Sequence, residues 1–212
     1  MNEILEKNKK SKTDGGEFTS TNYSAIKWSD VKDVFRGDSY TQVESPLPEE
    51  SFLNLTKCLS MVNNCFKDLN GKEAKRLYYI SPIIVAVCSA FNGGVSISVE
   101  EDIKGKRVQA NGRFEMVLQR GNKRVCIVEA KRDDIEQGMS QCLVGCEVAA
   151  DLDNLNVVYG IVTNYESWRL TRNGNETIET EQITLKMDNS VPDVASLREL
   201  CGKIYGILQE EN

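Results

Sequence analysis

Residues 112–115 read Gly-Arg-Phe-Glu, and residues 125–131 read Val-Cys-Ile-Val-Glu-Ala-Lys. The second stretch has the apolar composition of a strand. Alternate side chains of a strand point to the same face, so we expect Glu129 and Lys131 to share one. Glu115 adds a second carboxylate on the preceding strand. Two carboxylates beside an ammonium group suit a hard divalent cation and a water molecule that must lose a proton, the chemistry of phosphodiester hydrolysis.

The length of the turn between these two strands decides whether the carboxylates meet. In an antiparallel hairpin, a shift of one residue in the pairing turns a side chain to the other face. A two-residue loop at Gly121-Asn122 would place Glu115 and Glu129 on opposite faces, whereas a three-residue loop or a β-bulge would place them on the same face. The site hypothesis therefore predicts an odd loop or a bulge.

Charge is distributed unevenly along the chain, although the formal net charge is only -6. A positive hairpin on an acidic body would guide a polyanion to one place. A solvated hairpin with interspersed Lys and Arg is the alternative, and the sequence leaves it open. Between residues 104 and 132 there are two acids, Glu115 and Glu129, and nine basic residues: Lys104, Lys106, Arg107, Arg113, Arg120, Lys123, Arg124, Lys131 and Arg132.

The absence of histidine from the 212 residues excludes histidine metal sites and catalytic triads that use histidine. The chain has seven cysteines and no Cys-x-x-Cys pair, which indicates buried free thiols in a reducing, intracellular compartment. We find no signal peptide, and the longest apolar run, residues 80–91, is too short to cross a bilayer. Loops of the Gly-x-Gly-x-x-Gly or Walker type are missing, which disfavours the usual nucleotide-binding enzymes.

The hydrophobic pattern predicts a polar, partly disordered N-terminal tail over residues 1–45 and one folded domain over residues 46–212. Pro82 is expected to bend or split the second long helix. Asp133 and Glu136 have the spacing of a capping box. The expected elements are helices at 49–69, 73–91 and 133–151, a last helix after residue 193, and strands at 95–99, 108–119, 124–131, 157–163, 168–172 and 177–185. Their order indicates an α/β fold, with helices on a central mixed sheet.

The chain resembles the PD-(D/E)XK nuclease superfamily, whose restriction-endonuclease-like core has the order αβββαβ. Glu129-Ala130-Lys131 matches the Glu-x-Lys motif of that family, and Glu115 stands where the family usually has Asp. Glu73, in the helix before the sheet, matches a further metal ligand found there. Gln141, in the helix after the motif, resembles a glutamine of several branches, with Gln137 as the competing candidate.

This resemblance implies a catalytic site of Glu73, Glu115, Glu129, Lys131 and Gln141. The three glutamates would bind Mg2+ or Mn2+, with the Ala130 carbonyl as an added oxygen ligand. The resemblance also implies nucleic acid as the partner, with DNA favoured over RNA and no membrane association. The residues expected to contact phosphates are Arg113, Arg124 and Arg132.

Within the superfamily, the chain looks most similar to the nuclease-like domains of Crinkler-type proteins of oomycetes and fungi. That likeness implies action in the nucleus or cytoplasm. One alternative is a catalytically inactive domain of the same fold that binds nucleic acid or a host protein. A pure protein-interaction domain is another. The sequence leaves open whether the chain forms a homodimer.

Overall fold

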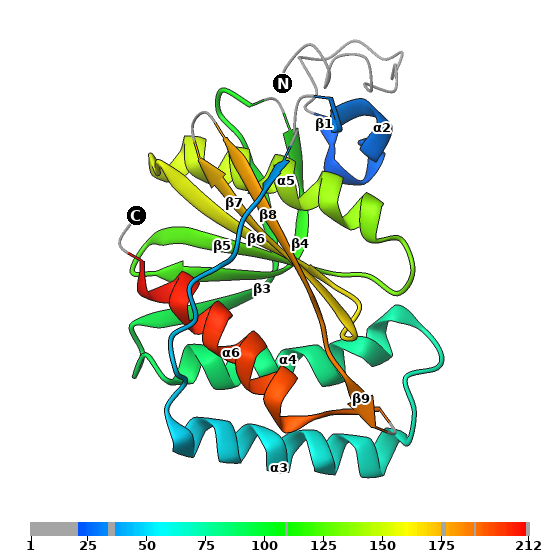
Figure 1. The fold of residues 1–212 in the computed structure, drawn as a ribbon. Helices are drawn as coiled ribbons and strands as arrows, with labels where there is room; N and C mark the ends of the chain where they lie inside the picture. The colour runs from blue at the N-terminus through cyan, green and yellow to red at the C-terminus, as the bar shows by residue number, and fades with distance from the viewer. Residues whose placement is uncertain (1–20, 34–36, 109, 175–176, 189, 211–212) are drawn as a thin grey trace.

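The computed structural model describes residues 21–33, 37–108, 110–174, 177–188 and 190–210. Within these residues the protein is a mixed α/β domain, built on an eight-stranded sheet with helices on both faces. The sheet has the order β1-β4-β5-β6-β7-β8-β2, and β3 pairs with β4. Figure 1 shows α5 on one side of the sheet and α3, α4 and α6 on the other.

The central part of the chain follows the predicted order of helix, three strands, helix and strand. It consists of α4 (Glu73–Ser89), β3 (Val95–Lys104), β4 (Ala110–Arg120), β5 (Lys123–Ala130), α5 (Ile135–Asp153) and β6 (Val157–Thr163). β4 pairs antiparallel with both β3 and β5, and β6 runs parallel to β5. All but one of the β6 residues are buried, as its continuous apolar run predicts.

The remaining elements extend this unit at both ends of the chain. The last helix begins as predicted, because the Asp193 carboxylate accepts hydrogen bonds from the amides of Ala195 and Ser196. These elements are α3 (Glu49–Phe66), β7 (Ser167–Gly174), β8 (Ile178–Thr184), β9 (Met187–Asp188), β10 (Val191–Pro192), α6 (Val194–Gln209), β1 (Thr21–Asn22), η1 (Tyr23–Ala25), α2 (Trp28–Val31) and β2 (Gly37–Ser39).

Residues 21–45 differ from the predicted tail. β1 pairs in parallel with β4, and β2 pairs in parallel with β8, so both strands are part of the sheet. Tyr23, Ile26 and Val31 are buried. The tail prediction was wrong for this stretch because three core side chains are dispersed among polar residues, and no periodicity shows at that density. Residues 1–20 lie outside the described residues.

Two smaller predictions about helices also need correction. α4 is one continuous helix that contains Pro82, so the proline does not split it. Tyr78, four residues earlier, lies on the exposed side of α4, where water can replace the missing hydrogen bond. The N-cap of α5 is Asp134 rather than Asp133, and its carboxylate accepts a hydrogen bond from the amide of Gln137.

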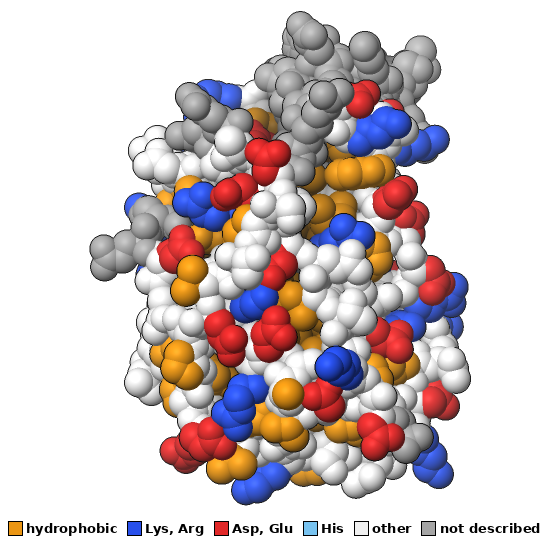
Figure 2. Space-filling model, viewed as in Figure 1, with side chains coloured by type: hydrophobic (Ala, Val, Ile, Leu, Met, Phe, Trp, Pro, Cys, Tyr) orange, Lys and Arg blue, Asp and Glu red, His pale blue; other side chains and the backbone are white. Residues whose placement is uncertain are grey.

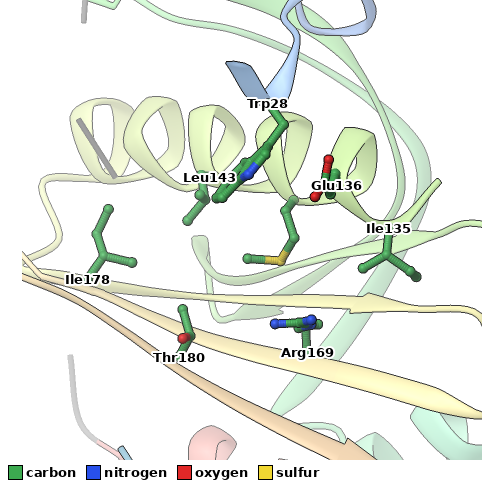
Figure 3. Close-up of a pocket in the computed structure, with 8 residues that line it drawn as sticks. Trp28, Ile135, Glu136, Leu143, Arg169, Ile178 and Thr180 are labelled. Carbon is green, nitrogen blue, oxygen red and sulfur yellow. The ribbon is translucent and has the colours of Figure 1, made fainter. Parts of the chain in front are cut away.

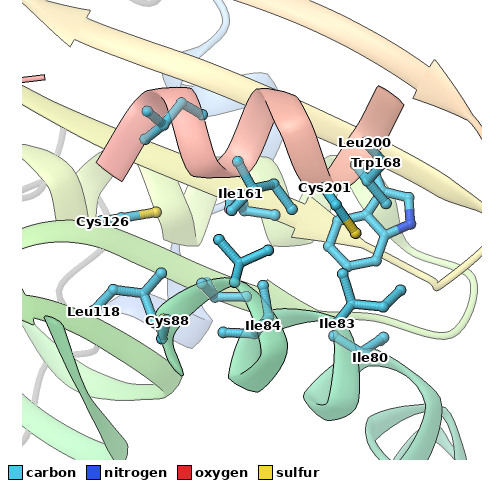
Figure 4. Packing of buried hydrophobic residues seen from close by; sticks show 14 of the residues in the cluster. Ile80, Ile83, Ile84, Cys88, Leu118, Cys126, Ile161, Trp168, Leu200 and Cys201 are labelled. Carbon is cyan, nitrogen blue, oxygen red and sulfur yellow. The ribbon is translucent and has the colours of Figure 1, made fainter. Parts of the chain in front are cut away.

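Two apolar cores lie on the two faces of the sheet. The larger core joins α3, α4 and α6 to the strands, and Figure 4 shows Ile83, Ile84 and Trp168 within it. The smaller core joins α5 and the N-terminal segment to the other face. There α5 lies very close to β4, because a Cβ atom on Gly145 would be 2.3 Å from the Phe114 ring. Five of the seven cysteines are buried, all seven are free thiols, and Cys58 and Cys65 are exposed.

We predict that Tyr23→Ala lowers the free energy of unfolding by about 3–5 kcal/mol, the usual cost of removing a buried aromatic ring. The Tyr23 side chain packs 4.8 Å from the Phe114 ring, and its hydroxyl donates to the Ile103 carbonyl at 3.0 Å. Urea denaturation measures the change, with Lys32→Ala at an exposed position of the same segment as control. Equal stability of the two variants would mean that this segment is detached from the fold.

Candidate functional site

The site is built around the end of β5. Glu129 is 3% exposed, and the Nζ atom of Lys131 donates to its Oε2 at 3.1 Å. The predicted common face of these two side chains is therefore confirmed. The Lys131 amide also donates to the Thr163 carbonyl at 2.8 Å, which fixes the chain as it leaves the strand next to β6.

The hairpin between β4 and β5 contains the predicted bulge. Its loop is the two-residue turn Gly121-Asn122, because Arg120 pairs with Lys123. The register then shifts between Leu118 and Gln119, and Met116 pairs with Val128. The extra residue in β5 restores the register that the site hypothesis requires. Continued by one residue, this register places Glu115 opposite Glu129 on the same face.

β4 leaves β5 at this point. Pairing between the two strands ends at Met116 and Val128, and β1 pairs with β4 only at Ala110 and Asn111. Within the described residues, the intervening segment of β4, residues 112–115, therefore has no strand on its β5 side. β4 also changes faces here, since Phe114 packs in the smaller core and Met116 in the larger one. The pairing of β4 with β5 therefore stops one residue before Glu129.

Burial dominates the electrostatics of the site. It raises the pKa of Glu129 to about 7; the ammonium of Lys131 opposes this shift, and the negative charges of Glu115 and Glu73 add to it. Burial likewise raises the pKa of Glu115, again opposed by Lys131, with Glu73 and Glu100 adding to the rise. The carboxylates thus lie close enough to repel one another, with one ammonium among them.

Glu73 stands in the first turn of α4, where negative charge interacts favourably with the helix dipole. Its Oε2 accepts a hydrogen bond of 3.0 Å from the Arg132 amide, so Glu73 lies at the exit of β5. The structure thus brings Glu73, Glu115, Glu129 and Lys131 into one region. Among the described residues, however, no three acidic, cysteine or histidine side chains are grouped tightly enough to form a ready metal site.

The two candidate glutamines of α5 have different surroundings. The side-chain amide of Gln137 donates from Nε2 to the Ile26 carbonyl at 2.9 Å, which ties the N-terminal segment to α5. The Oε1 atom of Gln141 is buried and has no hydrogen-bond partner in the described structure. Gln141 also lines a cavity of about 470 Å³ together with Arg113 and Asn111, whose Oδ1 is likewise unpartnered. The side chain of Gln137 is therefore engaged within the fold, whereas Gln141 has an acceptor without a partner in the described structure.

The three arginines predicted to contact phosphates all have acidic partners. Arg113 pairs with Asp102 and Glu100, and Arg132 with its neighbour Asp133. Arg124 pairs with Glu101 and Asp153 at 2.8 and 2.9 Å. On the face shown in Figure 2, basic and acidic side chains are interspersed.

Two further residues shape the site and were not recognised from the sequence. Glu100 lies opposite Glu115 on β3 and has a left-handed backbone (φ 51°), which is uncommon for a residue other than glycine. The run of three acids at 100–102, which interrupts an alternating strand, could have indicated it. A Cβ atom on Gly138 would lie 2.8 Å from Cγ of Lys131, so this glycine makes room for the lysine side chain. A lone glycine in a helix gives no sign of that role.

The described residues thus form a mixed α/β domain with a carboxylate and lysine site at the end of its central strands. In sequence, the chain is 42% identical over 209 residues to Crinkler effector protein 5 of Phytophthora infestans. The match covers 98% of this chain but 60% of that protein, so the chain spans about three fifths of its relative. The similarity supports the Crinkler-like relationship that the sequence predicts.

No family model matches the chain, and no solved structure matches it. Among the described residues, no helix is both long and apolar enough to cross a membrane.

We predict that Glu129→Gln changes how stability depends on pH. Because the folded pKa of about 7 lies above the usual 4.5, protonated Glu129 stabilises the fold below pH 4.5, and this contribution is lost as the pH rises through 7. The full difference is about 3 kcal/mol. The neutral glutamine lacks this dependence, so the variant should gain stability relative to the wild type between pH 4.5 and 8.

Urea denaturation in EDTA at several pH values measures this gain. Glu50→Gln, at an exposed position in the first turn of α3, is the control for the loss of one carboxylate. A constant difference between wild type and Glu129→Gln across this pH range would contradict the assigned shift.

Proposed function

We propose that this domain hydrolyses phosphodiester bonds of nucleic acid with a divalent metal ion, as a PD-(D/E)XK-type nuclease within a Crinkler-like protein. One observation carries the proposal: the buried Glu129 carboxylate accepts a hydrogen bond from Lys131, and the register of the hairpin places Glu115 opposite Glu129. The element order from α4 to β6 agrees with the αβββαβ core of that superfamily. The Crinkler-like relative supports the proposal at the level of the family.

The donor set fits Mg2+ or Mn2+ in its chemistry. Carboxylate and carbonyl oxygens are the ligands that hard cations prefer, and Mg2+ is usually held by only one or two carboxylates together with water and substrate phosphate. Glu115, Glu129 and the Ala130 carbonyl would hold the ion, so a tight group of three acids is not required. Burial raises the pKa of Glu129 although the Lys131 ammonium opposes the shift, so a bound cation would further favour the charged carboxylate.

A bound ion would polarise a phosphoryl oxygen and lower the pKa of a water molecule. The chain itself supplies the remaining functions. The Lys131 ammonium, held by Glu129, would stabilise negative charge as it develops on the phosphate. Glu73 keeps the start of the segment after β5 in place through the Arg132 amide. The buried, unpartnered Oε1 atom of Gln141 would accept a hydrogen bond from the attacking water.

To bind near the site, a phosphate of the nucleic acid would replace the carboxylate that now pairs with an arginine. The side chains of Arg113 and Asp102 are both more than half exposed, and exposed ion pairs contribute only about 0–1 kcal/mol. A phosphate can therefore replace the carboxylate at little cost, and we expect binding to weaken as salt rises. We propose DNA as the favoured substrate over RNA, and an intracellular site of action in the nucleus or cytoplasm.

A catalytically inactive domain of the same fold, which binds nucleic acid or a host protein as an effector module, is the second candidate. Specific contacts favour it: the three arginines expected on phosphates are engaged by acids of the chain, and Lys131 is engaged by Glu129. In this reading the carboxylate cluster is a structural ion-pair network. Binding without cleavage would distinguish it from a nuclease.

We predict that the wild type cleaves DNA in Mg2+ or Mn2+ but not in EDTA, and that Glu129→Gln and Lys131→Ala each lower the rate about 100-fold or more. The assay compares plasmid, linear and single-stranded DNA with RNA, and Glu50→Gln is the matched control. Equal cleavage by all proteins would identify a contaminant. Binding by all of them with no cleavage would favour the inactive domain.

We also predict that Mn2+ raises the melting temperature of the wild type and leaves that of Glu129→Gln unchanged. An ion that binds only the folded state stabilises it by about 2.7 kcal/mol at a concentration 100 times its dissociation constant. Differential scanning fluorimetry with Mn2+ against EDTA measures the shift without any substrate. An identical shift in both proteins would place the bound ion elsewhere.

A further inference from the structure

A second cavity lies on the flank of α5, away from the carboxylate site. It has a volume of about 280 Å³ and lies between the first turns of α5, α2 and the strands β7 and β8. Figure 3 shows Trp28 and Glu136 on the helical side of the cavity, with Arg169 and Thr180 on the strands opposite. The lining residues are Trp28, Ile135, Glu136, Met139, Leu143, Arg169, Ile178 and Thr180.

Arg169 is the unusual member of this lining. Its Nε atom is buried and has no hydrogen-bond partner, and no ion pair to Arg169 is present in the described parts of the chain. Other arginines of the domain, such as Arg124 and Arg172, bind carboxylates. A guanidinium presents its donors as a rigid planar fork that matches two acceptors on one edge of a ligand. No hydrogen bond from its terminal nitrogens to another described residue is present either, so the guanidinium has unused donors beside the cavity.

The remaining walls define the shape and polarity of the ligand. Trp28 is partly exposed and supplies an aromatic face, while Met139, Leu143 and Ile178 are apolar. Glu136 supplies acceptors on the side away from Arg169, and no ion pair joins the two residues. A planar ligand that stacks on Trp28 can thus present acceptors to the arginine and donors to the carboxylate.

We propose that this cavity binds a guanine base. Guanine carries two acceptors, O6 and N7, which arginine recognises with two hydrogen bonds, and its N1-H and amino groups are donors for Glu136. Adenine carries an amino group in place of O6, so it would present a donor to Arg169 and is rejected. The cavity reads the base and not the phosphates, which agrees with the absence of a Walker-type loop in the sequence.

The base could come from a free nucleotide or from a nucleic-acid strand. Glu129 and Arg169 both pair with Val162, so they point to the same face of the sheet with one strand between them, at a spacing of about 10 Å. The first turns of α5 pass between them, because Gly138 packs on Val162. The proposal concerns binding alone and does not require the nuclease function.

Tryptophan fluorescence tests the proposal with the full chain. The chain has two tryptophans, and Trp168 is fully buried, so a ligand in the cavity should quench Trp28. We expect GMP to quench emission in EDTA and AMP to bind about tenfold more weakly or worse. Trp28→Phe should remove the change. Arg169→Met should abolish binding, and Arg169→Lys, which keeps the charge but not the fork, should lose the preference for GMP.

IMP lacks the amino group that Glu136 is proposed to bind. The Glu136→Gln variant should therefore show a smaller preference for GMP over IMP than the wild type. Arg198→Met, on α6 at the opposite face of the sheet, is the control, and circular dichroism confirms the fold of each variant. A response to a guanine oligonucleotide without one to GMP would identify a strand base as the ligand. Equal responses to GMP and AMP, or unchanged binding by Arg169→Met, would overturn the proposal.

Discussion

A carboxylate that is almost entirely removed from water must be neutralised, and Glu129 is in that position. Burial raises its pKa to about 7, so near neutral pH either a proton or a cation has to supply the missing charge. The Lys131 ammonium supplies part of it at 3.1 Å. Two neighbouring residues help to position this pair. Gly138 leaves space for the lysine side chain, and Glu73 accepts a hydrogen bond from the segment that follows β5.

The pairing of β4 with β5 stops next to this buried charge. Full-length pairing would have continued past Glu129. Instead the ladder ends at Met116, and β4 turns toward the other core, with the strained Glu100 beside the turn. The N-terminal segment then closes the far end of β4 through β1, which makes a stretch of polar sequence part of the architecture.

Much of the fold can be predicted from the sequence, because long periodic segments indicate their own structure. The helices at 49 and 73 and the strand at 157–163 lie where hydrophobic spacing places them. The part played by the described residues between 21 and 45 was not predicted, because their buried apolar side chains are few and scattered among polar ones. In the site, strand alternation predicts the Glu129 and Lys131 pair. It does not predict which glutamine is engaged or which acids hold the arginines, since those contacts join segments far apart in the chain.

The bulge in the hairpin has a consequence for how this chain can change over time. Side chains at the tip, such as Lys123, are exposed and tolerate replacement, but the number of residues between β4 and β5 does not. Loss of a single residue there would turn Glu129 into the larger apolar core and present Ala130 in its place. Within this turn, the number of residues therefore constrains the site more than their chemical identity, because a one-residue insertion or deletion moves Glu129 to the other face of the sheet.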